Sequence, residues 1–188
     1  MKKNYLKIAA ACAVLFFTGC SKYFEVDTND ILKDEDYVGN ANELYSGYMG
    51  IAAKVQKVAD QAVFLADLRT DLLEPTKNAP QDLWDLYYYR EKQGNEFANP
   101  KGFYDIIINA NNYLAKVIEY RKKNPKAIEE AHYNSIISGA IRFKVWSYLM
   151  IGKLYGKAAY FDDKNLDINK VGEIPVLTLD QLLSLIHI

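Results

Sequence analysis

Residues 83–95, with the sequence LWDLYYYREKQGN, gather the side chains of this chain that are best suited to binding a ligand. One tryptophan and three tyrosines offer flat apolar faces with polar tips. Charged and amide groups follow within six residues, and such groups fix the orientation of a ligand in a mostly apolar site. This set suits a molecule with C–H groups on one face and hydroxyls at its rim, such as a sugar ring. The candidate ligand-binding residues are Trp84, Tyr87, Tyr88, Arg90 and Asn95.

The same aromatic residues also allow a purely structural interpretation. Trp84 and Tyr88 lie four positions apart, so on a helix they would share one face and could attach this segment to a core. The chain holds 15 tyrosines, so a tyrosine alone says little about function. Both interpretations stay open at the level of sequence.

Metal-dependent hydrolysis has little support in the sequence. Glu129 and Glu130 beside His132 lack the spacing and the second histidine of a His-Glu-x-x-His site. The polar residues at positions 27–30 lack the glycine and the distal glutamate of an EF-hand loop. We therefore expect no metal site and no cofactor.

Several polar residues within apolar helical segments are interpreted as structural. Asn109 and Asn111 are expected to be buried amides that satisfy backbone groups between helices. Arg142 lies in an apolar stretch, where an unpaired charge would be unfavourable. We expect a carboxylate partner for it, either Asp67 or Asp71.

The first 19 residues have the features of an export signal. A basic start is followed by an apolar run at positions 8–17, which is too short to span a bilayer. Thr18-Gly19-Cys20 resembles a bacterial lipobox, in which the cysteine is acylated and becomes the first mature residue. The alternative is an ordinary signal peptide with a coincidental cysteine. We predict a leader at 1–19, lipidation at Cys20 and a tether at 20–39.

Cysteine content and charge exclude further classes of function. Cys12 would leave with the leader and Cys20 would carry lipid, so no thiol remains for a disulfide, a zinc site or a nucleophile. Three of the 23 Lys and Arg residues lie in the leader, which leaves 20 against 24 acidic residues and a net charge of −4. A nucleic-acid-binding protein would show a basic face instead.

Apolar residues three and four positions apart predict the elements that must carry these side chains. Helices are expected at 42–60, 103–122 and 128–155, and a further apolar segment at 62–73 ends before Pro75. Gly156 suits the position just after a helix. The second and third helices are expected to form an antiparallel pair.

The remaining segments complete an all-α prediction. Only 173–179 has an extended pattern, and Pro175 makes it an edge strand or a connector. Residues 75–100 are predicted to form a long irregular loop, and such loops are commonly functional. The helices are expected to pair as in tetratricopeptide repeats, although the sequence shows no repeat of that period.

The end of the chain suggests a helix that is cut short. Thr178 and Gln181 have the spacing of a capping box, which opens a helix. The last six residues, LSLIHI, match the translation of a transposon end used in sequencing-library preparation. We predict a partial helical domain at 40–182 and a non-native tail at 183–188; the alternative is that an amphipathic helix ends there.

Five segments, taken in order with the lipobox-like start, resemble the N-terminal part of SusD/RagB-type outer-membrane lipoproteins. Most specific is the helix with Tyr-Asp-x-Ile-x-x-x-Asn, followed by an arginine-containing helix that ends in Tyr-Gly. The segments are NANELYSGYMG (40–50), ADLRTDLLEPT (66–76), FYDIIINANNYLAKV (103–117), AIRFKVWSYLMIGKLYG (140–156) and IPVLTLDQL (174–182).

The resemblance implies a nutrient-binding protein without catalysis. Such proteins lie at the cell surface on a SusC-like TonB-dependent transporter and capture glycan, or in some branches peptide, for import. The implied location is the outer membrane, held by the lipid and facing outside. The implied scaffold is tetratricopeptide-like and carries its ligand sites on loops.

Two other classes of function remain as alternatives. A lipid-anchored helical-repeat adaptor of the cell envelope would have a groove and no affinity for sugars. A lipoprotein glycosidase would need two carboxylates facing one cleft, and no such pair stands on a common loop of the sequence.

Overall fold

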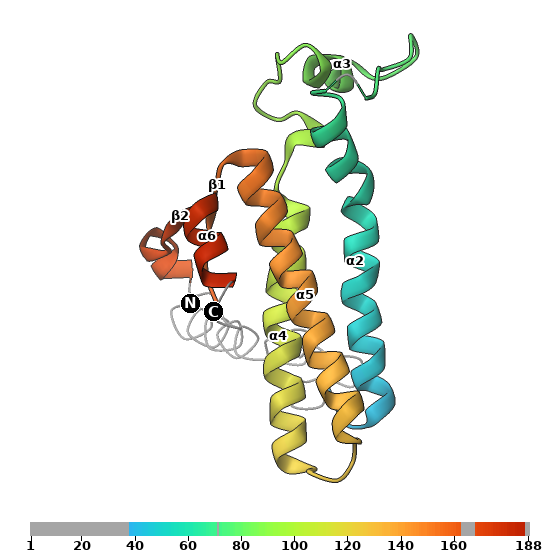
Figure 1. The fold of residues 1–188 in the computed structure, drawn as a ribbon, viewed down its shortest axis with the longest axis vertical. Helices are drawn as coiled ribbons and strands as arrows, with labels where there is room; N and C mark the ends of the chain where they lie inside the picture. Colours follow the sequence, from blue (N-terminus) through green and yellow to red (C-terminus); the bar gives the residue numbers. More distant parts are fainter. Residues whose placement is uncertain (1–37, 71, 163–167, 187–188) are drawn as a thin grey trace, which may run out of the picture. The chain divides into compact units, whose positions relative to one another are not determined.

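Figure 1 shows the computed structural model of the chain, which describes residues 38–70, 72–162 and 168–186. These residues are mostly helical, which confirms the all-α prediction. The predicted leader, Cys20 and nearly all of the tether lie outside the described residues. The elements are α2 (Ala41–Asp67), α3 (Gln81–Tyr87), η4 (Glu96–Ala98), α4 (Lys101–Lys123), α5 (Glu130–Tyr155), β1 (Lys157–Ala159), η5 (Ile168–Glu173), β2 (Val176–Thr178) and α6 (Leu179–Ile186).

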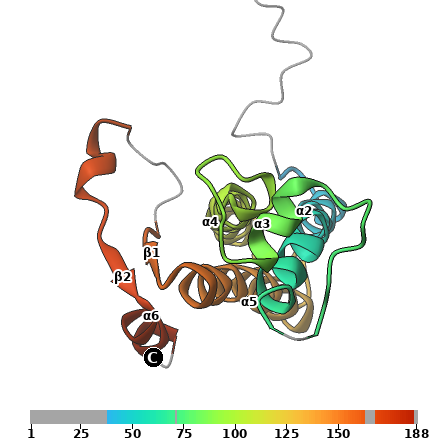
Figure 2. The same cartoon turned by 90° about the horizontal axis from the view of Figure 1, so that it is seen from above.

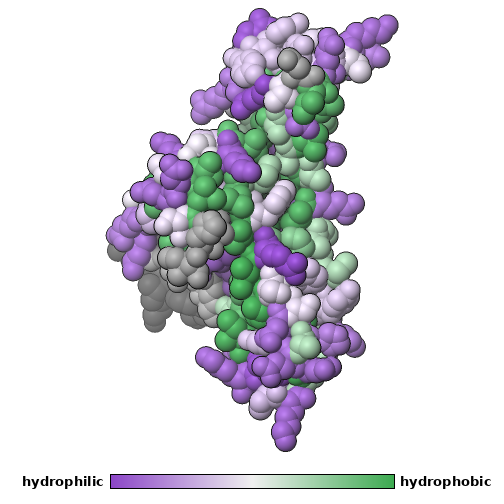
Figure 3. All heavy atoms as spheres, viewed as in Figure 1, coloured by the Kyte–Doolittle hydropathy of each residue, from purple (hydrophilic) through white to green (hydrophobic). Residues whose placement is uncertain are grey.

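Three long helices make up most of residues 38–186. α4 runs antiparallel to α5, as predicted, and α2 packs against both while running in the same direction as α5 (Figures 1 and 2). Their apolar stripes meet in one core. On the visible surface, Figure 3 shows a band of apolar residues along the middle, with hydrophilic residues toward both ends. The fully buried side chains of this core include Leu44, Phe103, Ile106, Ile107, Tyr113, Val117, Ile151 and Leu182.

α2 is longer than the sequence pattern predicted. Asn40 accepts hydrogen bonds from the backbone N–H groups of Asn42 (2.9 Å) and Glu43 (3.0 Å), so the helix begins with a side-chain cap. The predicted break near position 60 is wrong, because the helix continues to Asp67. Positions 59–67 hold no glycine or proline, and Ala62 and Leu65 extend the same buried stripe.

The prediction of an irregular loop at 75–100 is also wrong in part. α3 occupies Gln81–Tyr87, and η4 adds a short 3-10 turn before α4. Leu83 and Leu86 lie three positions apart on α3 and face the end of α2, and Leu86 is fully buried. A helix of only 7 residues gives too short a periodic signal to be found from sequence.

A small hairpin follows α5 and leads into α6. Gly156 ends α5 with φ 81°, the left-handed conformation expected of a residue after a helix. β1 pairs antiparallel with β2, so the extended segment predicted at 173–179 is an edge strand, while β1 was not predicted. The capping box is confirmed, since the Thr178 N–H donates to Gln181 (2.9 Å) and the Gln181 N–H donates to Thr178 (3.4 Å).

Polar residues between the helices follow the predictions in part. The amide of Asn111 is buried and donates to the Phe161 carbonyl at 3.3 Å, as expected of a structural amide. Asn109 donates instead to the Asp105 carbonyl of its own helix, at 2.7 Å. Within residues 38–186, no described helix is both long and apolar enough to cross a membrane.

Candidate ligand-binding sites

The segment between α2 and α4, here called the aromatic loop (residues 83–95), is attached to the bundle by apolar side chains on one side of α3. Leu86 is fully buried, and Leu83 and Tyr87 pack with it against Leu65 and Leu68 at the end of α2. These contacts fix α3 against the helices. The aromatic residues on the rest of α3 are therefore held on a rigid support.

Trp84 and Tyr88 stack on each other instead of joining that apolar cluster. Their ring centroids lie 5.8 Å apart with an interplanar angle of 18°, and Tyr87 meets both rings edge-on, at 6.0 Å and 5.1 Å. The Arg90 guanidinium lies over the Tyr88 ring, 4.7 Å from its centroid. Tyr88 nevertheless keeps 51% of its surface exposed. The structure thus brings four of the five predicted ligand-binding residues into one partly exposed cluster.

Asn95, the fifth predicted residue, has its amide engaged within the loop. It is 5% exposed; its Nδ2 donates to the Asp82 carbonyl at 2.9 Å, and its Oδ1 accepts from the Phe97 N–H at 3.0 Å. The first bond joins the end of the loop to the start of α3, and the second caps the 3-10 turn η4. Asn95 therefore positions the loop, whereas the sequence placed it among the residues that contact the ligand.

Tyr89 belongs to the same surface and was not among the predicted site residues. It has φ 55°, and it is the one non-glycine residue of the described segments with a positive φ. The Tyr89 N–H donates to the Leu86 carbonyl (3.1 Å) and the Arg90 N–H donates to the Asp85 carbonyl (2.7 Å). This is the Schellman pattern, with a tyrosine at the position that glycine usually occupies. The ring is 67% exposed, and its hydroxyl donates to the Arg69 carbonyl.

α5 contacts η4, the 3-10 turn that follows the aromatic loop, through Tyr155. Its hydroxyl donates to the Ala98 carbonyl at 3.1 Å. Burial raises the pKa of Tyr155 to about 12, against the lowering effects of a hydrogen bond with Gln61 and of the Arg69 charge. The hydroxyl therefore keeps its proton at neutral pH and remains a donor to η4.

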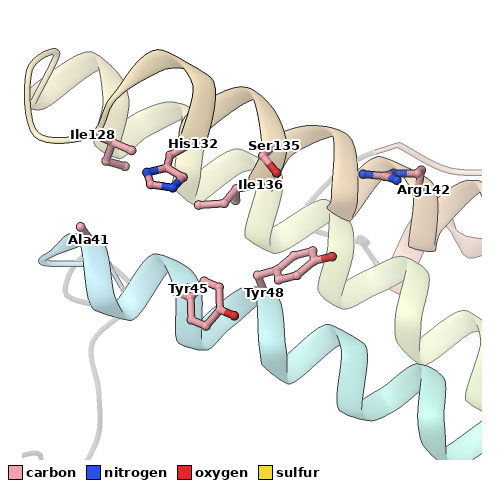
Figure 4. Close-up of a pocket in the computed structure, with 8 residues that line it drawn as sticks. All are labelled: Ala41, Tyr45, Tyr48, Ile128, His132, Ser135, Ile136 and Arg142. Carbon is pink, nitrogen blue, oxygen red and sulfur yellow. The ribbon is translucent and has the colours of Figure 1, made fainter.

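A second candidate site is a cavity of about 270 Å³ between the first half of α2 and the first half of α5 (Figure 4). We call it the interhelical cavity. The lining residues of α2 lie four and three positions apart, and those of α5 lie on one turn at positions 132–136 and further along at Arg142. It is lined by Ala41, Tyr45, Tyr48, Ile128, His132, Ser135, Ile136 and Arg142.

Arg142 lies at this cavity instead of in a buried ion pair. Its side chain is exposed, and its Nε donates to the Ser138 carbonyl one turn earlier on α5, at 3.3 Å. We predicted a carboxylate partner because we expected the Arg142 charge to be buried, and that expectation is wrong. Asp71, one of the two predicted partners, lies outside the described residues. The interhelical cavity was missed because its two helices are far apart in the sequence: α2 ends at Asp67 and α5 begins at Glu130.

Residues 38–70, 72–162 and 168–186 hold no group of three or more His, Cys, Asp or Glu side chains that could bind a metal ion. Comparisons of the chain with protein-family models, with curated proteins and with solved structures found no match. The assignment of a function therefore depends on the chemistry of these side chains and on the resemblance of its sequence motifs.

Proposed function

We propose that this protein is a lipid-anchored nutrient-binding protein of the cell outer membrane, of the SusD/RagB type. It faces outside and captures a ligand, in the first place a glycan, for import through a SusC-like TonB-dependent transporter. The ligand binds at the aromatic loop, at Trp84, Tyr87, Tyr88 and Arg90. Binding involves no catalysis and no cofactor.

The observation that carries this proposal is the way α3 divides its side chains. Leu83, Leu86 and Tyr87 attach the helix to the bundle, while Trp84 and Tyr88 stack together beside them with Tyr88 half exposed. Aromatic rings that are fixed in place and open to solvent suit the apolar face of a sugar. Because other residues attach the segment to the core, the purely structural interpretation of Trp84 and Tyr88 loses its main support.

The arrangement of the long helices is compatible with the scaffold that the resemblance implies. α4 and α5 pack antiparallel over most of their lengths, and this antiparallel packing supports the proposal of tetratricopeptide-like helix pairs. In this proposal the pair belongs to a repeat scaffold whose loops hold the ligand, and the aromatic loop is one of them.

Affinity electrophoresis through gels that contain starch, β-glucan or xylan tests the proposal. We expect at least one polysaccharide to retard the native protein. Replacing both Trp84 and Tyr88 with alanine should abolish the retardation, because the sugar rings lose the two aromatic faces on which they pack, and the melting temperature should change little.

Leu86→Ala is the matched control on the same helix. It removes the fully buried side chain that attaches α3 to α2, and we expect it to destabilise the protein by about 2–5 kcal/mol. A Trp84/Tyr88 double variant that melts as early as Leu86→Ala would restore the structural interpretation. Equal retardation of the native protein and the double variant would exclude the aromatic loop as the glycan site.

A further inference from the structure

The interhelical cavity combines apolar walls with unused polar groups. Ile128 and Ile136 line it on the α5 side, and the rings of Tyr45 and Tyr48 line it on the α2 side (Figure 4). The hydroxyl groups of Tyr45, Tyr48 and Ser135 form no hydrogen bond with another described residue, and Tyr45 and Ser135 are exposed to solvent. These groups are free to bind a ligand that enters the cavity.

The residues that line the interhelical cavity carry positive charge and no negative charge. Arg142 is cationic, and none of the eight lining residues is acidic. The bond from its Nε to the Ser138 carbonyl directs the Arg142 side chain back along α5, toward the turn that carries Ser135. Its remaining N–H groups can donate two parallel hydrogen bonds to a carboxylate, which is the geometry that a guanidinium favours. The cavity therefore complements an anion at its Arg142 end.

The walls of the cavity are held in place by contacts outside it. Tyr48 stacks on Phe143 with centroids 5.5 Å apart, and a Cβ at Gly139 would lie 2.6 Å from the Tyr48 ring. Only glycine at position 139 leaves room for the ring against α5. At the other end, Arg121 donates to the Ile128 carbonyl and fixes that wall. The cavity is thus part of the packed structure of these helices.

The geometry points to the interhelical cavity as a binding site for a small amphipathic carboxylate, with one aromatic ring or a short alkyl chain. An apolar cavity of roughly 150 Å³ is sufficient for benzene. The volume of about 270 Å³ therefore accommodates a ring with a short side chain that ends in the acid group. The ring packs between the tyrosines and the isoleucines, and the carboxylate binds Arg142. This site shares no residue with the aromatic loop and does not depend on the function proposed for that loop.

Calorimetric titration of the full chain with 3-phenylpropionate tests this inference, with 3-phenylpropanol as the uncharged comparison. We expect saturable binding of the acid at one site per chain and much weaker binding of the alcohol. Arg142→Gln should weaken the binding of the acid by roughly 10- to 100-fold, the usual contribution of hydrogen bonds to a charged group. Lys153→Gln removes a charge from an exposed position elsewhere on α5 and should change the affinity by less than about twofold.

Gly139→Ala provides a second variant that leaves every charge in place. It requires the Tyr48 ring to move, so we expect it to weaken binding of the acid. The Trp84/Tyr88 double variant should bind the acid as the native protein does, which separates this inference from the proposed glycan site. The inference is overturned by an absence of saturable binding, by equal binding of the alcohol, or by an affinity that neither Arg142→Gln nor Gly139→Ala lowers.

Discussion

Tyr89 occupies a backbone conformation that is unfavourable for its side chain. A residue other than glycine in the left-handed region has its Cβ close to the carbonyl oxygen, at a free-energy cost of about 1–2 kcal/mol. The Schellman hydrogen bonds around it and the bond from its hydroxyl to the Arg69 carbonyl hold it there. In this conformation the ring of Tyr89, next to Tyr88 on the aromatic loop, is 67% exposed. Strained residues of this kind cluster at functional sites.

Comparison of two variants isolates the backbone strain at Tyr89. Tyr89→Ala and Tyr89→Gly both lose the ring and its hydrogen bond, but only glycine adopts a positive φ without strain. We expect the glycine variant to be more stable than the alanine variant by about 1 kcal/mol, measured by urea unfolding. Equal stability of the two variants would mean that the left-handed conformation at this position is not maintained.

Glycines set the closest approaches between the helices. A Cβ at Gly102 of α4 would lie 2.4 Å from Val58 of α2, and a Cβ at Gly152 of α5 would lie 3.0 Å from Leu179 and 3.1 Å from Leu182. Leu182 is almost fully buried, and it packs against α5 at Gly152. The position of α6 thus depends on one residue of α5 that has no side chain.

A larger side chain at position 152 should release α6 from α5. In Gly152→Val we expect faster hydrogen exchange for the backbone amides of α6, because Leu179 and Leu182 can no longer approach α5. Gly50→Val is the matched control, since a Cβ at Gly50 of α2 meets no atom within 4 Å. If exchange in α6 were the same for both variants, this contact would not hold the helix in place.

The long helices could be predicted from sequence because their apolar residues repeat over many turns. α4 and α5 lie within two residues of the predicted boundaries, and Gly156 and the Thr178–Gln181 capping box act as their local chemistry indicates. α3 and β1 are too short to show a period, and the end of α2 was misjudged. Tyr89 was not predicted and the pairing of Arg142 was predicted wrongly for another reason: the role of each depends on neighbours that the sequence does not bring together.

One hydrophobic core connects α2, α4, α5, β1 and α6. Its buried members run from Leu44 near the start of α2 to Leu182 in α6, and a smaller cluster around Leu86 attaches the aromatic loop. The loop therefore depends on far fewer apolar contacts than the three long helices do. Local opening of the protein is expected to begin at the aromatic loop.

Attachment to the membrane can be tested on the whole chain in cells. If Cys20 carries lipid, cells supplied with radiolabelled palmitate should label the protein, and the protein should fractionate with membranes, because several acyl chains together hold a protein to a bilayer. Cys20→Ser should abolish the labelling and shift the protein to the fraction that is free of membranes. Cys12→Ser, in the predicted leader, is the control and should change neither result. An unlabelled native protein would contradict the lipid anchor.

The length of α2 separates the two candidate sites. Tyr45 borders the interhelical cavity and Leu65 supports the aromatic loop, and twenty residues of helix between them correspond to roughly 30 Å. That distance exceeds the Debye length in physiological salt, about 8 Å, several times over. Salt would therefore screen a charge bound in the interhelical cavity almost completely at the aromatic loop, and the ligands proposed for the two sites would not compete.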